Sequence, residues 1–270
     1  MYTKGTEMRR TRRRAWFVIS LLFVTGFSWA AAGGHEDAGD AKAMLKAVSD
    51  YVSSQKTIEF TFDSYIEIIT PQLEKIQYTS SGDAQLSRPD KFRAHRVGGY
   101  SEVSLIFDGK TASILGESLN SYTQFEAPGT IDQLVAALRA GHGVAIPGAD
   151  MLLSNAYEVL VAGVQEAKHI GRGVIGGVEC EHLAFRNFDT DWQLWFEVGD
   201  KPIPRKLVIT SKTMASAPQY SFQIKTWKAG ATPAKGAFAF VPPPGAKKIG
   251  PDELIRLDEL PPEQPAGDNQ

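Results

Sequence analysis

Residues 56–70 read KTIEFTFDSYIEIIT, and their apolar residues fall at alternate positions. Ile58, Phe60, Phe62, Ile66 and Ile68 are even-numbered, whereas most odd-numbered neighbours are polar or charged. Successive side chains of a strand point to opposite faces of a sheet, so one face here is apolar. At 100° per residue the same apolar set would scatter around a helix. The stretch therefore predicts a long β-strand in a large antiparallel sheet with one apolar face.

Short alternating segments separated by turn residues follow this strand. Asp108-Gly109 is a strong hairpin signal between two of them. The expected strands are residues 74–86, 91–97, 102–107, 111–115, 121–126, 163–171, 177–187, 191–198, 204–212 and 219–227. Residues 237–245 are expected to form a last extended segment. The pattern is typical of an antiparallel meander.

Three segments have apolar residues at helical spacing instead, namely 41–54, 130–140 and 150–161. In the second, Thr130 is the expected cap and Gly141 the expected end. The third is expected to break near Ser154 and Asn155. These helices lie before and in the middle of the strands, without β-α-β alternation. The order predicts an α+β, mostly β fold, a curled antiparallel half-barrel of about ten strands closed by inserted helices.

Residues 1–32 have the layout of a secretory signal peptide, with arginines, an apolar run and the small residues Ala30, Ala31 and Ala32. The alternative is an uncleaved membrane anchor, but the apolar run is shorter than the roughly 20 residues that span a bilayer. We expect cleavage near Ala32–Gly33, by a Sec or a twin-arginine route that the sequence does not distinguish. The mature protein is expected in the periplasm, without a membrane span.

Charge and cysteine content narrow the class of partner. Removing six of the 29 basic and one of the 31 acidic residues with the signal peptide leaves a net charge of −7. This acidic balance argues against nucleic-acid binding, which needs a basic surface. Cys180 is the single cysteine, so no disulfide can form within the chain. We expect a monomer with one domain over residues 41–248, a flexible leader at 33–40 and a disordered acidic, proline-rich tail at 249–270.

Five short motifs, in order, are RPDKFR at 88–93, FDGK at 107–110, WQLWF at 192–196, PIPRKL at 202–207 and FAFVPPP at 238–244. With them, the chain resembles, over about residues 41–248, a family of predicted periplasmic proteins of unknown function that have the fold of the lipoprotein carriers LolA, LolB and LppX. The resemblance implies a half-barrel whose hydrophobic hollow holds acyl chains. Carriers of this type work with inner- and outer-membrane partners, but the fold could also hold a different cargo.

Candidate catalytic groups have simpler explanations. Cys180 and His182 share one face of a strand and Glu181 the other, yet a metal site needs three or four converging ligands. Asp189 and Asp191 are expected in a turn, where aspartate bonds the local backbone. The glycine-rich residues 171–177 precede no helix that could bind phosphate and are expected to form a loop. The remaining histidines are scattered and expected to be surface or hydrogen-bonded residues: His35, His95, His142 and His169. We therefore expect no enzyme, no metal and no cofactor.

The apolar faces of sheet and helices can form either a packed core or a ligand hollow. The residues expected to line it are Ile58, Phe60, Phe62, Ile66, Ile68, Ile76, Tyr78, Leu105, Phe107, Ile131, Leu134, Leu138, Met151, Leu152, Trp192, Leu194 and Phe196. With a hollow, the protein would bind a lipid or acyl chain under a lid at 130–161, hinged at Gly141, Gly143 and Gly148. With a filled core, it would be an envelope protein-interaction module, a sensor or chaperone. A third, weaker alternative is an envelope hydrolase.

Overall fold

A computed structural model describes residues 36–142 and 146–250. The chain divides into units 1–32 and 33–270, and every described residue belongs to the second unit. The expected signal peptide and cleavage site lie outside the described residues, as does the tail from residue 251. Within the second unit, twelve strands form one sheet in the order β12-β6-β5-β4-β3-β2-β1-β11-β10-β9-β8-β7.

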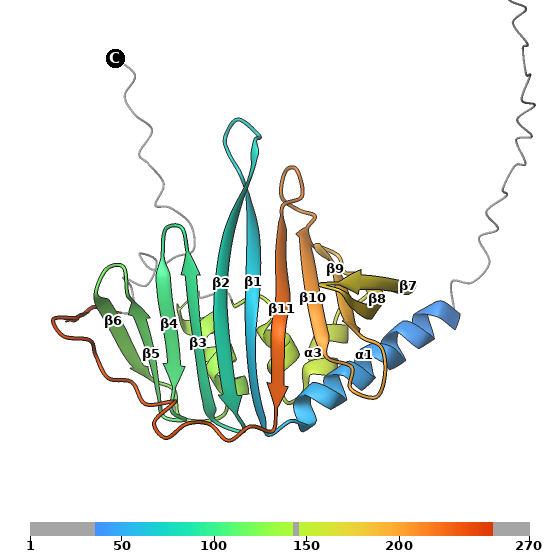
Figure 1. Ribbon diagram of the computed structural model, residues 1–270. Helices are drawn as coiled ribbons and strands as arrows, with labels where there is room; N and C mark the ends of the chain where they lie inside the picture. Colours follow the sequence, from blue (N-terminus) through green and yellow to red (C-terminus); the bar gives the residue numbers. More distant parts are fainter. Residues whose placement is uncertain (1–35, 143–145, 251–270) are drawn as a thin grey trace, which may run out of the picture. The chain divides into compact units, whose positions relative to one another are not determined.

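The long strand predicted at 56–70 is central to this sheet. It is β1 (Thr57–Ile69), which pairs with β2 (Lys75–Ser87) on one side and β11 (Gln219–Ala229) on the other, both antiparallel (Figure 1). The remaining strands are β3 (Lys91–Gly98), β4 (Glu102–Phe107), β5 (Thr111–Gly116), β6 (Ser121–Glu126), β7 (Glu166–Ile175), β8 (Val178–Arg186), β9 (Thr190–Glu197), β10 (Pro204–Ser211) and β12 (Lys247–Lys248). The antiparallel meander is thus confirmed on both sides of β1.

Two extended segments differ from the prediction. Residues 171–177 are not a loop, because β7 continues to Ile175 and only Gly176 and Gly177 form the turn. Both have positive φ, 58° and 85°, which a two-residue hairpin turn requires and glycine tolerates. Residues 237–245 form turns and irregular backbone rather than a strand. Three consecutive prolines there lack the N–H that a strand donates, and only β12 pairs, in parallel, with β6.

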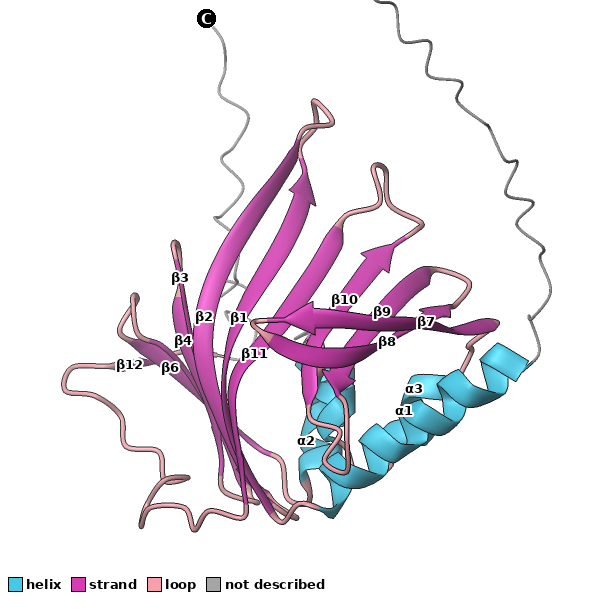
Figure 2. Ribbon diagram, turned by 45° about the vertical axis from the view of Figure 1, so that its right-hand side comes forward, coloured by secondary structure: helices cyan, strands magenta, loops and turns pink. Residues whose placement is uncertain are grey.

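The helices lie on one side of the curled sheet (Figure 2). They are α1 (Glu36–Ser54), α2 (Ile131–His142), the short 3₁₀ helix η1 (Ala149–Leu152) and α3 (Ala156–Val161). Helix α1 begins at Glu36, so residues 36–40, expected as part of the leader, belong to this helix. Ala38, a strong helix former, lies before the expected start at Ala41.

The local signals around α2 are largely confirmed. The Thr130 N–H donates to Gln133 Oε1 at 2.8 Å, and the Gln133 N–H donates to Thr130 Oγ1 at 3.4 Å, a capping box at the helix start. The helix continues one residue past Gly141 instead of ending there. The expected break in the later segment falls between η1 and α3, at residues 153–155.

The core lies between the helices and the face of the sheet that they cover, which we call the concave face. Ile58, Phe60 and Phe62 of β1 belong to one buried cluster with Leu134 and Leu138 of α2. The α+β, mostly β architecture of an open curled sheet with helices on one side is therefore confirmed. In the described part of the chain, no helix is long and apolar enough to cross a membrane.

Candidate functional site: the concave face of the sheet

The inner part of the concave face is an aromatic cluster on β1 and β11. Phe60 stacks on Trp227 with ring centroids 5.7 Å apart, and Phe62 lies against Phe222 at 4.7 Å. Gly82 of β2 pairs with Phe62, and a Cβ there would lie 2.6 Å from Phe62 Cζ. The missing side chain lets the Phe62 ring lie across the backbone of β2.

The helices pack directly onto this inner part. Thirteen of the expected lining residues are buried in the resulting cluster or packed against it: Ile58, Phe60, Phe62, Leu105, Phe107, Ile131, Leu134, Leu138, Met151, Leu152, Trp192, Leu194 and Phe196. The sequence therefore identified residues that the structure brings together. In the described structure they pack against one another, as side chains of a core do.

A buried hydroxyl pair marks the end of this packed part. Ser64 is fully buried, and its Oγ lies 3.0 Å from Ser80 Oγ on the paired strand β2. Both side chains belong to the same face as Phe62, since the strands pair in an unbroken register from Thr57 to Ile69. The apolar stripe of β1 is thus interrupted once, between Phe62 and Ile66.

Beyond Ser64 and Ser80, the concave face of β1 and β2 continues outside the packed core. The four remaining expected residues, Ile66, Ile68, Ile76 and Tyr78, pair across β1 and β2 and do not belong to the buried cluster. Ile76 is 40% exposed, and the Tyr78 ring contacts that of Tyr100, which is 59% exposed, at 5.5 Å. We call these four residues and Tyr100 the outer apolar surface. The first four residues lie on β1 and β2, whose hairpin projects beyond the helices (Figure 1), and Tyr100 lies in the turn between β3 and β4.

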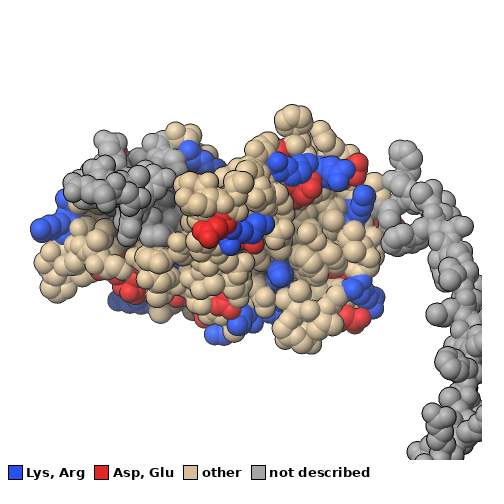
Figure 3. Space-filling view, turned by 90° about the horizontal axis from the view of Figure 1, so that it is seen from above, with Lys and Arg blue, Asp and Glu red and all other residues tan. Residues whose placement is uncertain are grey.

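At the end of the molecule from which the β1–β2 hairpin projects, the visible charged side chains do not form a large patch of one sign (Figure 3). Viewed from there, most visible atoms belong to residues other than Lys, Arg, Asp and Glu, and the charges form small groups of both signs (Figure 3). The ordered ion pairs of the central strands lie on the opposite, convex face. Lys225 Nζ is 2.9 Å from Asp63 Oδ2, and the hydrogen bonds from Lys225 and Ser81 lower the pKa of Asp63.

Two shallow hollows on the described surface lie along strands, and neither is bounded by a helix. One of about 400 Å³ is lined mostly by polar residues of the central strands: Asp63, Tyr65, Thr79, Ser80, Ser81, Val97 and Gly98. The other, of about 180 Å³, lies along β7, β8 and β9. Because the inner residues pack against one another, a ligand held among them would have to displace them, whereas the outer apolar surface is open to solvent at Ile76 and Tyr100.

The covering segment from α2 to α3 is tied together by its own polar contacts. Arg139 of α2 donates two hydrogen bonds to Asp150 of η1, at 2.7 and 3.0 Å. Asp132 accepts hydrogen bonds from the backbone N–H, at 3.1 Å, and from the hydroxyl of Ser154. We call residues 130–161 the lid segment. These contacts join its helices to one another rather than to the sheet.

The candidate nucleophile and its neighbour are packed as structural residues. Cys180 is fully buried, burial raises the pKa of its thiol, and Sγ donates to the Val178 carbonyl at 3.4 Å. His182 stacks on Trp195 at 4.0 Å and bonds Gln193 at 3.0 Å, while burial lowers its pKa. A thiol with a raised pKa is a poor nucleophile. These contacts favour the interpretation of both residues as structural.

The aspartate pair is divided between a turn and a strand. Asp189 lies in the turn before β9, whereas Asp191, also expected in the turn, lies in β9 itself. Asp191 Oδ1 is 3.0 Å from Lys212 Nζ and 3.6 Å from Arg186 Nε. These two ion pairs give the Asp191 carboxylate a structural role.

One group of side chains was not anticipated. His95, expected to be an ordinary surface or hydrogen-bonded histidine, lies with Glu102 and Glu117 on the convex face. The signal was available in the alternation, because a hairpin joining 91–97 to 102–107 brings positions 95 and 102 to the same face. Glu117 follows β5, the second strand of the next hairpin, and its distance from His95 depends on the register of β4 and β5.

Comparison with known proteins supplies the family. An uncharacterized conserved protein from Thermus thermophilus superposes with a TM-score of 0.48 at 10% identity, over 78% of this chain and 98% of that one. The Mycobacterium tuberculosis lipoprotein LppX gives 0.44 at 12% identity, over 70% and 95%. MucB of Pseudomonas aeruginosa, in its complex with MucA, gives 0.42 at 15% identity, over 75% and 61%. Among curated proteins, none matches the chain in sequence. Residues 41–250 match the family described as "Predicted periplasmic protein (DUF2092)", so the chain belongs to this family of periplasmic proteins, as its motifs indicated.

Proposed function

We propose that this periplasmic protein binds a lipid or another amphipathic ligand on the concave face of its sheet. The observation that carries the proposal is the outer apolar surface, which continues the core stripe of β1 beyond the helices. Ile76 and Tyr100 are 40% and 59% exposed there. A contiguous exposed apolar surface is a common mark of a binding site. The function would be carriage or sensing of the bound molecule.

The chemistry of the surface suits an acyl chain with a polar end. Burying each methylene contributes about 0.8 kcal/mol without any hydrogen-bond requirement. Tyr78 and Tyr100 present apolar rings with hydroxyl groups, which suit the boundary between a chain and a polar head. Lipoprotein acyl chains belong to this class of ligand.

A longer chain would reach the inner part only if the lid segment moved. Its internal contacts, Arg139 with Asp150 and Asp132 with Ser154, allow the segment to move as one unit. Gly148 at the start of η1 has a φ of 84°, a conformation that glycine adopts without strain, and Gly141 lies near the end of α2. Gly143, the third expected hinge, lies outside the described residues. We propose that the lid segment opens to admit a chain into the space of the thirteen packed residues.

The first experiment is mass spectrometry of an organic extract of the protein purified from a bacterial periplasm without detergent. A stoichiometric lipid would support the proposal and name the ligand class. A matched pair of variants then locates the site. Ile76→Asp places a charge on the concave face, and Val97→Asp does so on the convex face at a similar exposure, 40% against 44%.

Ile76→Asp is expected to weaken retention of a fluorescent fatty-acid analogue by about tenfold or more, since it removes burial of about 1.5–3 kcal/mol. Val97→Asp should bind as the unsubstituted protein does. Both positions are exposed, so both variants should fold, which circular dichroism checks. No uptake by the wild-type protein, or equal loss in both variants, would contradict the proposal.

A second candidate function is an envelope protein-interaction module. The packing of the thirteen inner residues favours it, because a filled core needs no ligand. In that case the outer apolar surface would contact a protein rather than a lipid. Crosslinking in the periplasm with a photoreactive residue at Tyr100 separates the two, since it yields a lipid adduct in one case and a defined protein adduct in the other.

A further inference from the structure

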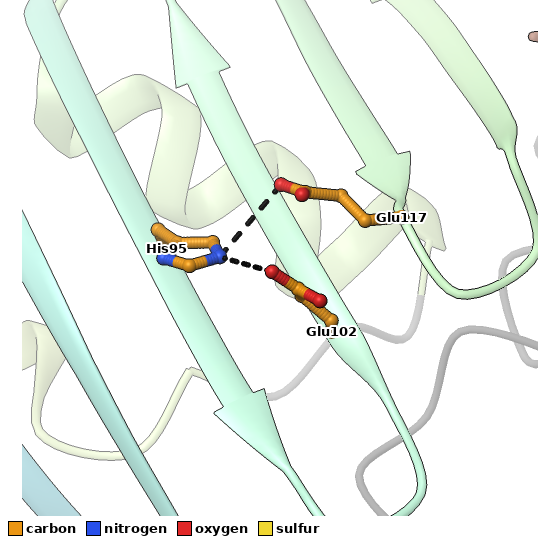
Figure 4. A group of neighbouring side chains, drawn as sticks. All are labelled: His95, Glu102 and Glu117. Carbon is orange, nitrogen blue, oxygen red and sulfur yellow. Dashed lines mark hydrogen bonds and ion pairs between the residues drawn. The ribbon is translucent and has the colours of Figure 1, made fainter.

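We propose that His95, Glu102 and Glu117 form a site for a divalent transition-metal ion such as Zn²⁺ on the convex face of the sheet. The three residues come from β3, from the start of β4 and from the turn that follows β5 (Figure 4). One donor atom of each lies within 4.8 Å of the others. An imidazole nitrogen with two carboxylates is a ligand set that zinc and its neighbours accept, and the open positions would be taken by water.

The distances between the donor atoms fit one central ion. His95 Nε2 lies 3.1 Å from Glu102 Oε1 and 3.7 Å from Glu117 Oε1. Ligands bound to zinc at about 2.0–2.1 Å in a tetrahedral arrangement lie about 3.4 Å from each other. The two separations bracket that value, so an ion could bind with only small side-chain rotations.

Two further side chains lie next to the donor groups. His95 Nδ1, the ring nitrogen that faces away from the glutamates, is 3.6 Å from Asp83 Oδ1 on β2. A metal-bound histidine commonly directs its other N–H to a carboxylate, which fixes the tautomer and the ring. The Ser104 hydroxyl donates to Glu117 Oε1 at 2.8 Å and orients that carboxylate.

Strand pairing explains why these side chains meet. His95 pairs directly with Asp83 on one side and with Ser104 on the other, and Ser104 pairs with Leu115. Glu102 and Glu117 lie two residues from Ser104 and Leu115, and the Glu117 N–H donates to the Glu102 carbonyl at 2.8 Å. The side chains of the site therefore project from one face of β2, β3 and β4 and from the turn that follows β5.

The charge of the group also favours a cation. Asp83, Glu102 and Glu117 surround one imidazole, and neighbouring like charges on adjacent strands are destabilising. Among the described residues, no lysine or arginine forms an ion pair with any of the three carboxylates. A divalent ion would compensate the net negative charge of the three carboxylates.

The test uses the whole protein, purified without a polyhistidine tag, treated with a chelator and titrated with ZnCl₂ in a calorimeter at pH 7.5. One ion per chain is expected. Loss of a ligand in His95→Gln or Glu117→Gln should weaken binding by about 100-fold or more, the upper end of the 10–100-fold cost of outer-shell changes. Asp83→Asn keeps all three ligands and should cost about tenfold.

His169→Gln is the matched control. His169 is as exposed as His95, at 24%, and its Nε2 lies 2.8 Å from a single glutamate, Glu181. This variant should bind zinc as the wild-type protein does. If His95→Gln fails to fold, Glu117→Gln tests the same site from a more exposed position. Absence of uptake by the wild-type protein, unchanged binding in the folded ligand variants, or equal loss in His169→Gln would each overturn the proposal.

Discussion

The proposed opening of the lid segment can be tested by truncating one side chain of α2. Leu134 is 1% exposed in the core cluster, so Leu134→Ala removes an almost fully buried group. Such truncations cost about 2–5 kcal/mol. Because Leu134 would be exposed in the open state, the free energy of opening should fall by that amount. The lower limit corresponds to about 30-fold more frequent opening.

The assay is native-state hydrogen exchange followed by mass spectrometry of peptides from α2 and from the strands. In Leu134→Ala, α2 amides should exchange about 30-fold faster or more. Leu115→Ala is the control, because Leu115 is 7% exposed on the convex face of β5 and would stay buried when the lid segment opens. It should accelerate exchange in β4 and β5 and leave α2 unchanged. If Leu115→Ala accelerates α2 amides as much as Leu134→Ala does, the helices and the sheet open as one unit and the lid is refuted.

Three further predictions concern stability, each measured by urea unfolding. Gly82→Ala should destabilise by about 1–3 kcal/mol or more, because its Cβ would lie 2.3 Å from the His95 carbonyl oxygen, whereas Gly98→Ala should cost less, with no neighbour nearer than 3.5 Å. Equal effects of the two would contradict the packing at Phe62. Thr130→Ala should cost about 0.5–2 kcal/mol by removing the cap of α2, and no loss would mean that the hydrogen bond at 3.4 Å contributes nothing. Asp63 has a lowered pKa in the folded protein, so its contribution is present above the ordinary aspartate pKa and lost as pH falls through the folded value. Asp63→Asn should therefore be less stable than wild type at pH 7, and the difference should shrink as pH falls below the ordinary aspartate pKa; a difference that stays constant as pH falls would refute the linkage.

The strand pattern could be predicted because alternation is a local property of the sequence. It located β1 within one residue at each end, and the strands of the meander followed from turn residues. The failures lie where pairing decides the outcome. Residues 171–177 contain four glycines, which indicate a loop, but β8 pairs with them up to Ile175 and keeps them in the sheet. Helix α1 is a different case: it begins at Glu36, before the first residue with apolar helical spacing.

The sequence predicted which residues share the concave face, but not how much of that face the helices cover. Alternation assigned Ile66 and Ile68 to the same face as Phe60, which the register confirms. It could not show that the helices cover only the inner part, because their length and position relative to the sheet come from tertiary packing. The cluster at His95 was missed for a related reason. Its residues are up to 22 positions apart in the chain, from 95 to 117, and meet through the pairing of β3, β4 and β5.

The same alternation makes the two proposals separable. On β3 and β4, Ala94 and Leu105 pair on the concave face and pack against the core, whereas their neighbours in the sequence, His95 and Ser104, pair on the convex face at the proposed metal site. Ile76 and His95 therefore share a sheet but no contact, and changes at sites without shared partners act independently in general. Ile76→Asp should leave zinc binding intact, just as His95→Gln should leave ligand retention intact. Failure of the metal site would thus leave the ligand proposal standing, and loss of the ligand proposal would not remove the reason for the histidine and its carboxylates to lie together.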